Sequence, residues 1–138
     1  MYATMMKILV ALIFIYSLLV TSCVEGITGK TYVEINNNLP TGITLRVHCK
    51  SGDENLGIHD VTNWWGFSFT PQFFFWGTLY FCSFSWPGRF EWFDIYEQSR
   101  DWHYCNECIW RISPNGPCRL SDSSGEFDIC YPWNPPTN

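Results

Sequence analysis

Cysteine is the residue type whose number and spacing in this chain could support the most chemistry. Beyond the N-terminal segment the chain has Cys49, Cys82, Cys105, Cys108, Cys118 and Cys130. Cys105 and Cys108 have the spacing of a thiolate pair in a zinc site, and the last two cysteines could complete a four-cysteine set. However, the later spacing lacks the second close pair of a zinc ribbon, and an oxidising compartment would turn the same thiols into three disulfides. We therefore expect six bridged cysteines, no metal, no other cofactor and no cysteine nucleophile.

Histidine is the second residue type that could do chemistry. His48, His59 and His103 could supply the general acid and base of a hydrolase such as a ribonuclease. His48 lies between Arg46 and Lys50 on the polar positions of an alternating segment, and the other two lie near turns. Three solvated surface histidines are the simpler interpretation, although sequence spacing does not decide whether they converge in space.

Tryptophan suggests a third possibility, because aromatic residues make up 19% of the chain. Trp64, Trp65, Trp76 and Trp102 could form a platform on which sugar rings stack, which makes a secreted carbohydrate-binding or antimicrobial effector the alternative function. Core packing is the competing interpretation. On one strand, Trp64 and Trp65 must point to opposite faces, so one exposed tryptophan is expected. Some residues of the aromatic run 73–76 could also contact a partner.

The charge of the chain excludes two classes of partner. The formal net charge is −5, and the lysines and arginines are scattered singly among acidic residues. Binding to nucleic acid or to a membrane surface needs clustered basic residues. We expect neither kind of partner.

Residues 1–26 have the parts of a secretory signal peptide. Lys7 precedes an apolar run from Ile8 to Val20, and small and polar residues follow. The run covers 13 positions, whereas a spanning helix needs roughly 20 apolar residues, so we expect no membrane insertion after leader cleavage. Cleavage after Gly26 is favoured, with Ser22 and Cys23 as rival sites. Cleavage after Gly26 would remove Cys23 and leave an even set of cysteines in a secreted, extracellular protein.

The elements that must position these residues are predicted to be strands. From Ile43 to Lys50, apolar and polar residues alternate as in a half-buried strand. A weaker strand is expected at Lys30–Asn36, and the turn-forming residues 36–42 suggest that these two strands pair as a hairpin. Further strands are expected at Gly57–Val61, Trp64–Phe69, Thr78–Trp86, Arg89–Tyr96, Cys108–Ile112, Cys118–Leu120 and Glu126–Tyr131. Turn signals recur about every 8 to 12 residues, which predicts a single all-β domain, either a sandwich or a barrel.

Several short motifs in a fixed order resemble the plant self-incompatibility S1 family, also called the S-protein homologues. They are Val33–Asn37, Leu45–Lys50, Phe81–Trp86, Phe93–Tyr96, and the stretch with Arg100–Asp101, Cys105–Ile112 and Gly116. The resemblance spans about Val33 to Tyr131. It implies a small disulfide-stapled antiparallel β-sandwich over residues 27–131. It also implies a non-enzymatic extracellular ligand that a cell-surface receptor reads. We expect this ligand to be a monomer and to act in rejection of self pollen or in related reproductive or defence signalling.

The resemblance also frames the expected disulfides. Cys118 and Cys130 depart from the family's usual four-cysteine pattern and flank the turn Ser121–Gly125, so we expect them to pair. The other four are expected to bridge the early strands to the segment with Cys105 and Cys108. Six cysteines allow 15 connectivities, and the sequence does not choose among them.

Recognition is expected in loops carried by the rigid strands. The candidate loops are Ser51–Leu56, Pro87–Arg89 and above all Glu97–Tyr104. In the last, the candidate receptor-recognition residues are Glu97, Arg100, Asp101 and Trp102, and a purely structural turn is an equal alternative. Residues 132–138 contain three prolines and are expected to form a disordered tail, because proline cannot donate to a strand ladder.

Overall fold

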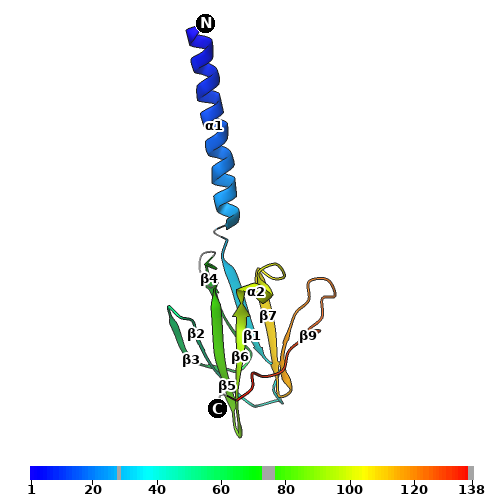
Figure 1. Ribbon diagram of the computed structural model, residues 1–138. Coiled ribbons are helices and arrows are strands. Elements are labelled where there is room, and N and C mark those ends of the chain that lie inside the picture. Colours follow the sequence, from blue (N-terminus) through cyan, green and yellow to red (C-terminus); the bar gives the residue numbers. More distant parts are fainter. Residues whose placement is uncertain (28, 73–76, 137–138) are drawn as a thin grey trace.

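The computed structural model describes residues 1–27, 29–72 and 77–136, without the side chains of residues 22–27. Helix α1 (Tyr2–Ile27) projects away from a domain made of strands (Figure 1). Its segment Tyr2–Thr21 has 20 residues with a mean hydropathy of 2.3. By length and composition it could cross a membrane, and a signal sequence passes the same test. The run from Ile8 to Val20 predicted too short an apolar segment, because the helix also includes the apolar residues Met5 and Met6.

The domain is mostly β, as expected, and its strands form two sheets. One sheet has the order β4-β1-β7-β8-β9 and the other has the order β3-β2-β5-β6. Between β6 and β7 lies a single helical turn, α2 (Gln98–Asp101). The strands are β1 (Thr31–Asn37), β2 (Leu45–Lys50), β3 (Asn55–Val61), β4 (Trp64–Phe69), β5 (Leu79–Trp86), β6 (Arg89–Glu97), β7 (Glu107–Ser113), β8 (Gly116–Arg119) and β9 (Ile129–Cys130).

Alternation of apolar residues explains why these segments are strands. Val33 and Ile35 of β1, and Leu45 and Val47 of β2, are fully buried, with half-buried or exposed residues between them. Both sheets contribute to one hydrophobic cluster, whose largest buried side chain is Trp110. Burial on one face fixes the register, because a slip by one residue would expose every apolar side chain of a strand.

The predicted pairing of the first two strands is wrong. β1 pairs with β4 on one side and β7 on the other, while β2 pairs with β3 and β5 in the other sheet. Asn37 fixes this crossover: its Nδ2 donates to the carbonyl oxygens of Ile43, Val61 and Thr62, and its Oδ1 accepts from the Leu39 amide. The turn-forming residues therefore carry the chain between sheets and do not close a hairpin.

The expectation of a wholly antiparallel fold is also wrong in one place. β1 and β7 run parallel, with Tyr32 opposite Glu107 and Asn37 opposite Ile112. Parallel neighbours cannot be joined by a tight hairpin. Here the connection between them runs through the whole of the second sheet.

Three disulfides lie among the described residues. Cys118 pairs with Cys130, as the sequence analysis expected, and the two lie opposite each other on β8 and β9. Cys49 pairs with Cys82 across β2 and β5, and Cys105 pairs with Cys108. The expected bridges from the early strands to Cys105 and Cys108 are therefore wrong, because neighbouring strands already place Cys49 and Cys82 side by side.

Two residues of the segment expected to be a disordered tail, Trp133 and Asn134, contact the domain. The Trp133 side chain packs near Phe84 and Trp86, and its Nε1 donates to the Pro114 carbonyl at 3.1 Å. The Asn134 amide donates to the Trp92 carbonyl at 2.8 Å. Proline removes amide donors only at its own positions, so Trp133 and Asn134 can still anchor the segment.

Candidate recognition surface

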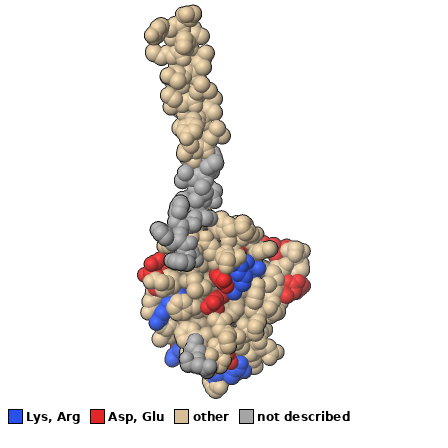
Figure 2. Space-filling view, viewed as in Figure 1, with Lys and Arg blue, Asp and Glu red and all other residues tan. Residues whose placement is uncertain are grey.

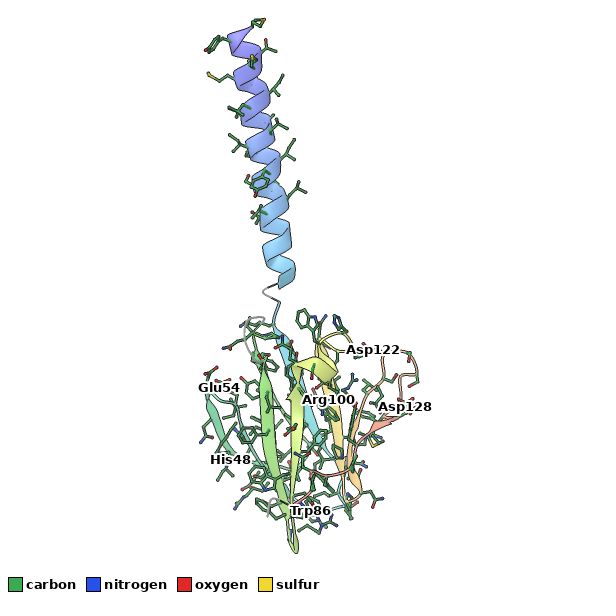
Figure 3. All side chains as sticks on the ribbon, viewed as in Figure 1. His48, Glu54, Trp86, Arg100, Asp122 and Asp128 are labelled. Atoms are coloured by element: carbon green, nitrogen blue, oxygen red, sulfur yellow. A yellow bond between two sulfur atoms is a disulfide. The ribbon has the colours of Figure 1, made fainter. Side chains whose placement is uncertain are left out.

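The loop expected to be most important lies at the end of the domain where the chain enters β1. The Tyr32 amide donates to the Asn106 carbonyl at 2.8 Å, which joins the start of β1 to the segment after α2. We call residues 97–106 the α2 segment. The turn at residues 51–54 lies toward the same end, whereas the hairpin at Pro87 and Gly88 lies at the opposite end, near Trp86 (Figure 3). The three predicted recognition loops therefore do not form one surface.

Asp101, one of the four candidate recognition residues, is fully buried. Its carboxylate accepts from the Glu97 amide at 3.0 Å and from Nε and Nη2 of Arg100 at 2.9 and 2.6 Å. Nε of Arg119 on β8 lies 3.8 Å from the same carboxylate. A buried carboxylate is tolerated when charges and hydrogen bonds compensate it. A partner has no access to this group in the folded chain.

Arg100, the second candidate, is also mostly enclosed, with 17% of its side chain exposed. Its guanidinium carbon lies 5.1 Å from the Phe93 ring centroid, 5.2 Å from that of Trp110 and 5.0 Å from that of Tyr131. Its Nη2 also donates to the Asp94 carbonyl at 2.8 Å. Cation–π contacts and charged hydrogen bonds together hold α2 against β6 and β7, which belong to different sheets.

Other residues of the α2 segment are exposed to solvent. Tyr104 is 67% exposed, and Glu97 and His103 are also exposed. The Trp102 side chain is half-buried, with its ring 6.3 Å from that of His103. The structure thus divides the four predicted residues, with Glu97 and Trp102 toward the surface and Arg100 and Asp101 beneath it.

A second part of this end is the turn before β3. The Tyr80 hydroxyl donates to the Glu54 carboxylate, and burial together with this carboxylate raises the pKa of Tyr80 above its usual value. A cleft of about 830 Å³ lies beside this pair, with Asp53, Thr78 and Lys30 among its lining residues. The hydrogen bond ties the turn to β5.

The histidines do not converge in the described structure. His48 and His59 lie on neighbouring strands but on opposite faces of the sheet, since His48 is opposite Ile58 and His59 is opposite Val47. The His59 ring stacks on Trp65 with centroids 4.1 Å apart, and His48 Nε2 lies 2.7 Å from Asn55 Oδ1. His103 lies in the α2 segment. Each ring therefore has its own local partner.

Two exposed aromatic side chains, Phe90 and Trp92, escaped the sequence analysis. Phe90 is 60% exposed and Trp92 is 41% exposed on the outer face of β6, with ring centroids 5.6 Å apart. Trp64 is 62% exposed, whereas its neighbour Trp65 packs against the core, as the alternation of strand side chains predicts. The exposure of Phe90 and Trp92 could have been predicted only from the strand pairing, which shows that both positions face outward. The aromatic run 73–76 lies outside the described residues.

Charge is dispersed over the domain. Acidic and basic side chains are interspersed on the face of the domain that Figure 2 shows. The Arg46 and Asp60 side chains form an exposed pair at 2.8 Å, and its hydrogen bond lowers the pKa of Asp60. Within the described part of the chain, no group of three or more His, Cys, Asp and Glu side chains is arranged to hold a metal ion.

Comparison with known proteins identifies similar chains. A family model described as "Plant self-incompatibility protein S1" matches residues 32–133. The chain is 50% identical to S-protein homolog 2 of Arabidopsis thaliana over 114 residues, which cover 78% of this chain and 70% of the relative. It is 40% identical to S-protein homolog 4 of the same plant over 145 residues, with 95% of each chain covered. No solved structure matches the chain.

Proposed function

This chain belongs to the plant self-incompatibility protein S1 family, and on that premise we propose that it is a secreted, non-enzymatic ligand recognised by a cell-surface receptor. Recognition occurs at the exposed part of the α2 segment, namely Glu97, Trp102, His103 and Tyr104. The buried pair Arg100 and Asp101 holds this surface in shape. The two sheets pack as a β-sandwich, and the mature monomer begins after Gly26.

Two observations support secretion. The apolar helix at the N-terminus has the length and composition of a signal sequence. Disulfides at Cys49–Cys82, Cys105–Cys108 and Cys118–Cys130 are stable in an oxidising compartment and rare in the cytosol. The mature chain starting at Ile27 would retain all six of these cysteines.

The observation that carries the ligand proposal is the division of the α2 segment into a fixed base and an exposed rim. Arg100 and Asp101 are held by contacts with Phe93, Trp110 and Arg119. Loops presented by a rigid scaffold are the usual carriers of specificity, because a fixed loop loses little conformational entropy on binding. The rim also includes an exposed aromatic ring, Tyr104, of the kind that anchors protein interfaces.

Substitution of exposed aromatic residues tests this proposal. We expect Tyr104→Ala to weaken saturable binding of the labelled mature protein to intact plant cells by at least tenfold. Phe90→Ala is the matched control, because Phe90 has nearly the same exposed fraction but lies on β6 near the opposite end. Both variants should unfold at the wild-type denaturant concentration. Equal binding by Tyr104→Ala and wild type, or equal loss in both variants, would contradict recognition at the α2 segment.

A further inference from the structure

The outer face of the sheet that contains β1 carries a hollow of about 520 Å³. It lies over β4, β1 and β7. Strand β6, which leads into α2, belongs to the other sheet. Its lining includes Glu34, Asn36, Trp64, Ile109, Arg111 and Phe127. The hollow thus combines an aromatic ring, a carboxylate, an amide and a guanidinium.

Strand register places three of these residues in one row. Asn36 on β1 lies opposite Trp64 on β4 and opposite Arg111 on β7. Neighbouring strands are about 4.8 Å apart, so the backbone positions of Trp64 and Arg111 are roughly 10 Å apart. A disaccharide unit fits this span.

Glu34 lies two residues before Asn36, on the same face of β1. Its Oε2 accepts from the Tyr32 hydroxyl at 3.1 Å and its Oε1 accepts from Asn36 Nδ2 at 3.0 Å. Asn36 Nδ2 also donates to the Trp110 carbonyl at 3.1 Å, which fixes the amide. A carboxylate can accept about four hydrogen bonds, so each oxygen of Glu34 keeps capacity for a ligand hydroxyl. Both side chains are oriented before a ligand arrives, which lowers the entropic cost of binding.

Trp64 and Arg111 form the two ends of the row. Trp64 is 62% exposed, which leaves its ring available for the C–H face of a sugar. The Arg111 guanidinium lies 3.9 Å from the centroid of the Phe127 ring. Among the described residues, no carboxylate forms a salt bridge with Arg111, although the protein as a whole is acidic. A guanidinium fixed by an aromatic ring can bind a ligand carboxylate bidentately.

We propose that this hollow binds an acidic oligosaccharide. One sugar ring stacks on Trp64, hydroxyl groups donate to the Glu34 carboxylate and to Oδ1 of Asn36, and the carboxylate of a uronic acid binds Arg111. This binding site lies on a different face from the α2 segment and adds glycan binding to the proposed ligand function. It does not depend on receptor recognition.

Titration of the secreted protein with oligogalacturonides tests the proposal, with neutral cello-oligosaccharides as the comparison. We expect calorimetry to give binding at least tenfold tighter for the acidic probe, weaker at higher salt. Trp64→Ala and Arg111→Gln should each weaken it by at least tenfold. Trp92→Ala is the matched control, because it removes an exposed tryptophan from the other sheet.

Amide chemical shifts of the wild-type protein provide a test that does not depend on the folding of any variant. The acidic probe should perturb residues 34–36, 64 and 109–111 before any others. Failure of both probes to bind, equal affinity for the two, or perturbations confined to the α2 segment or β6 would each overturn the proposal. An equal loss in Trp92→Ala and Trp64→Ala would overturn it as well.

Discussion

At the scale of single residues, the buried carboxylate of Asp101 is compensated by groups from three parts of the chain. Arg100 is its neighbour in sequence, Arg119 comes from β8, and the Glu97 amide comes from the end of β6. Two guanidinium groups near one carboxylate keep the cluster from carrying an uncompensated negative charge. Removal of that charge would leave two enclosed cations without their anion.

We therefore expect Asp101→Asn to lower the free energy of unfolding by about 3 kcal/mol, the usual cost of breaking a buried ion pair from one side. Denaturant unfolding with intact disulfides measures this change. The matched control is Asp60→Asn, which breaks the exposed pair with Arg46 and should leave the unfolding midpoint unchanged. Similar effects from both substitutions would contradict the structural role of Asp101.

Tyr80 gives a pH dependence of stability. Burial and the Glu54 carboxylate raise its pKa in the folded state above the ordinary value of 10.0. Above that pH the unfolded chain loses the phenolic proton while the folded chain keeps it, so stability falls as pH rises. We expect Tyr80→Phe to lose less stability than wild type between neutral pH and the alkaline range. Tyr104→Phe is the matched control, because it removes an exposed tyrosine hydroxyl, and an identical alkaline slope in all three proteins would count against this assignment.

The sequence alone indicated the charge cluster but not its burial. Gln98, Ser99, Arg100 and Asp101 form a polar stretch between a strand and a cysteine, which is the usual pattern of an exposed loop. Arg119 is distant in sequence, and only the pairing of β8 with β7 brings it beneath α2. Burial of a charged residue depends on such distant partners, which residue types do not reveal.

At the scale of elements, two disulfides connect strands that are already neighbours. The residues joined are 33 positions apart for Cys49–Cys82, 12 apart for Cys118–Cys130 and 3 apart for Cys105–Cys108. A bridge that closes a longer loop removes more entropy from the unfolded chain. The three bridges should therefore contribute unequally to stability.

We expect replacement of both cysteines by alanine to lower stability most for Cys49–Cys82 and least for Cys105–Cys108. The chain-entropy relation gives about 4, 3 and 2 kcal/mol for the long, middle and short loops. Denaturant midpoints of the three double variants measure the order. The Cys118–Cys130 variant isolates the loop effect best, since Cys130 is exposed and its loss leaves little core empty. A larger loss for the shortest loop would contradict the entropic account.

Element positions were largely predictable, whereas their partners were not. Each predicted strand overlaps a strand of the structure, because alternating burial leaves a period of two in the sequence. The last predicted strand, Glu126–Tyr131, is only Ile129–Cys130 in the structure. Alternation reports which face of a strand is buried but not which strand lies beside it. The Asn37 crossover and the parallel pairing of β1 with β7 consequently went unpredicted.

At the scale of the whole molecule, helix α1 and the α2 segment lie at the same end. The chain leaves α1 and enters β1 beside residue 106, which follows the exposed rim (Figure 1). A retained leader would place this rim next to a membrane, whereas cleavage after Gly26 would free it. Leader removal and receptor recognition are thus linked in the proposed function.

The measurement that tests the central claim most directly is equilibrium binding of the labelled, secreted protein to intact plant cells, before and after mild surface proteolysis. We expect saturable binding that unlabelled protein displaces and that proteolysis of the cells abolishes, because the proposed receptor is a protein. Binding that never saturates, or that survives removal of surface proteins, would contradict a receptor-recognised ligand.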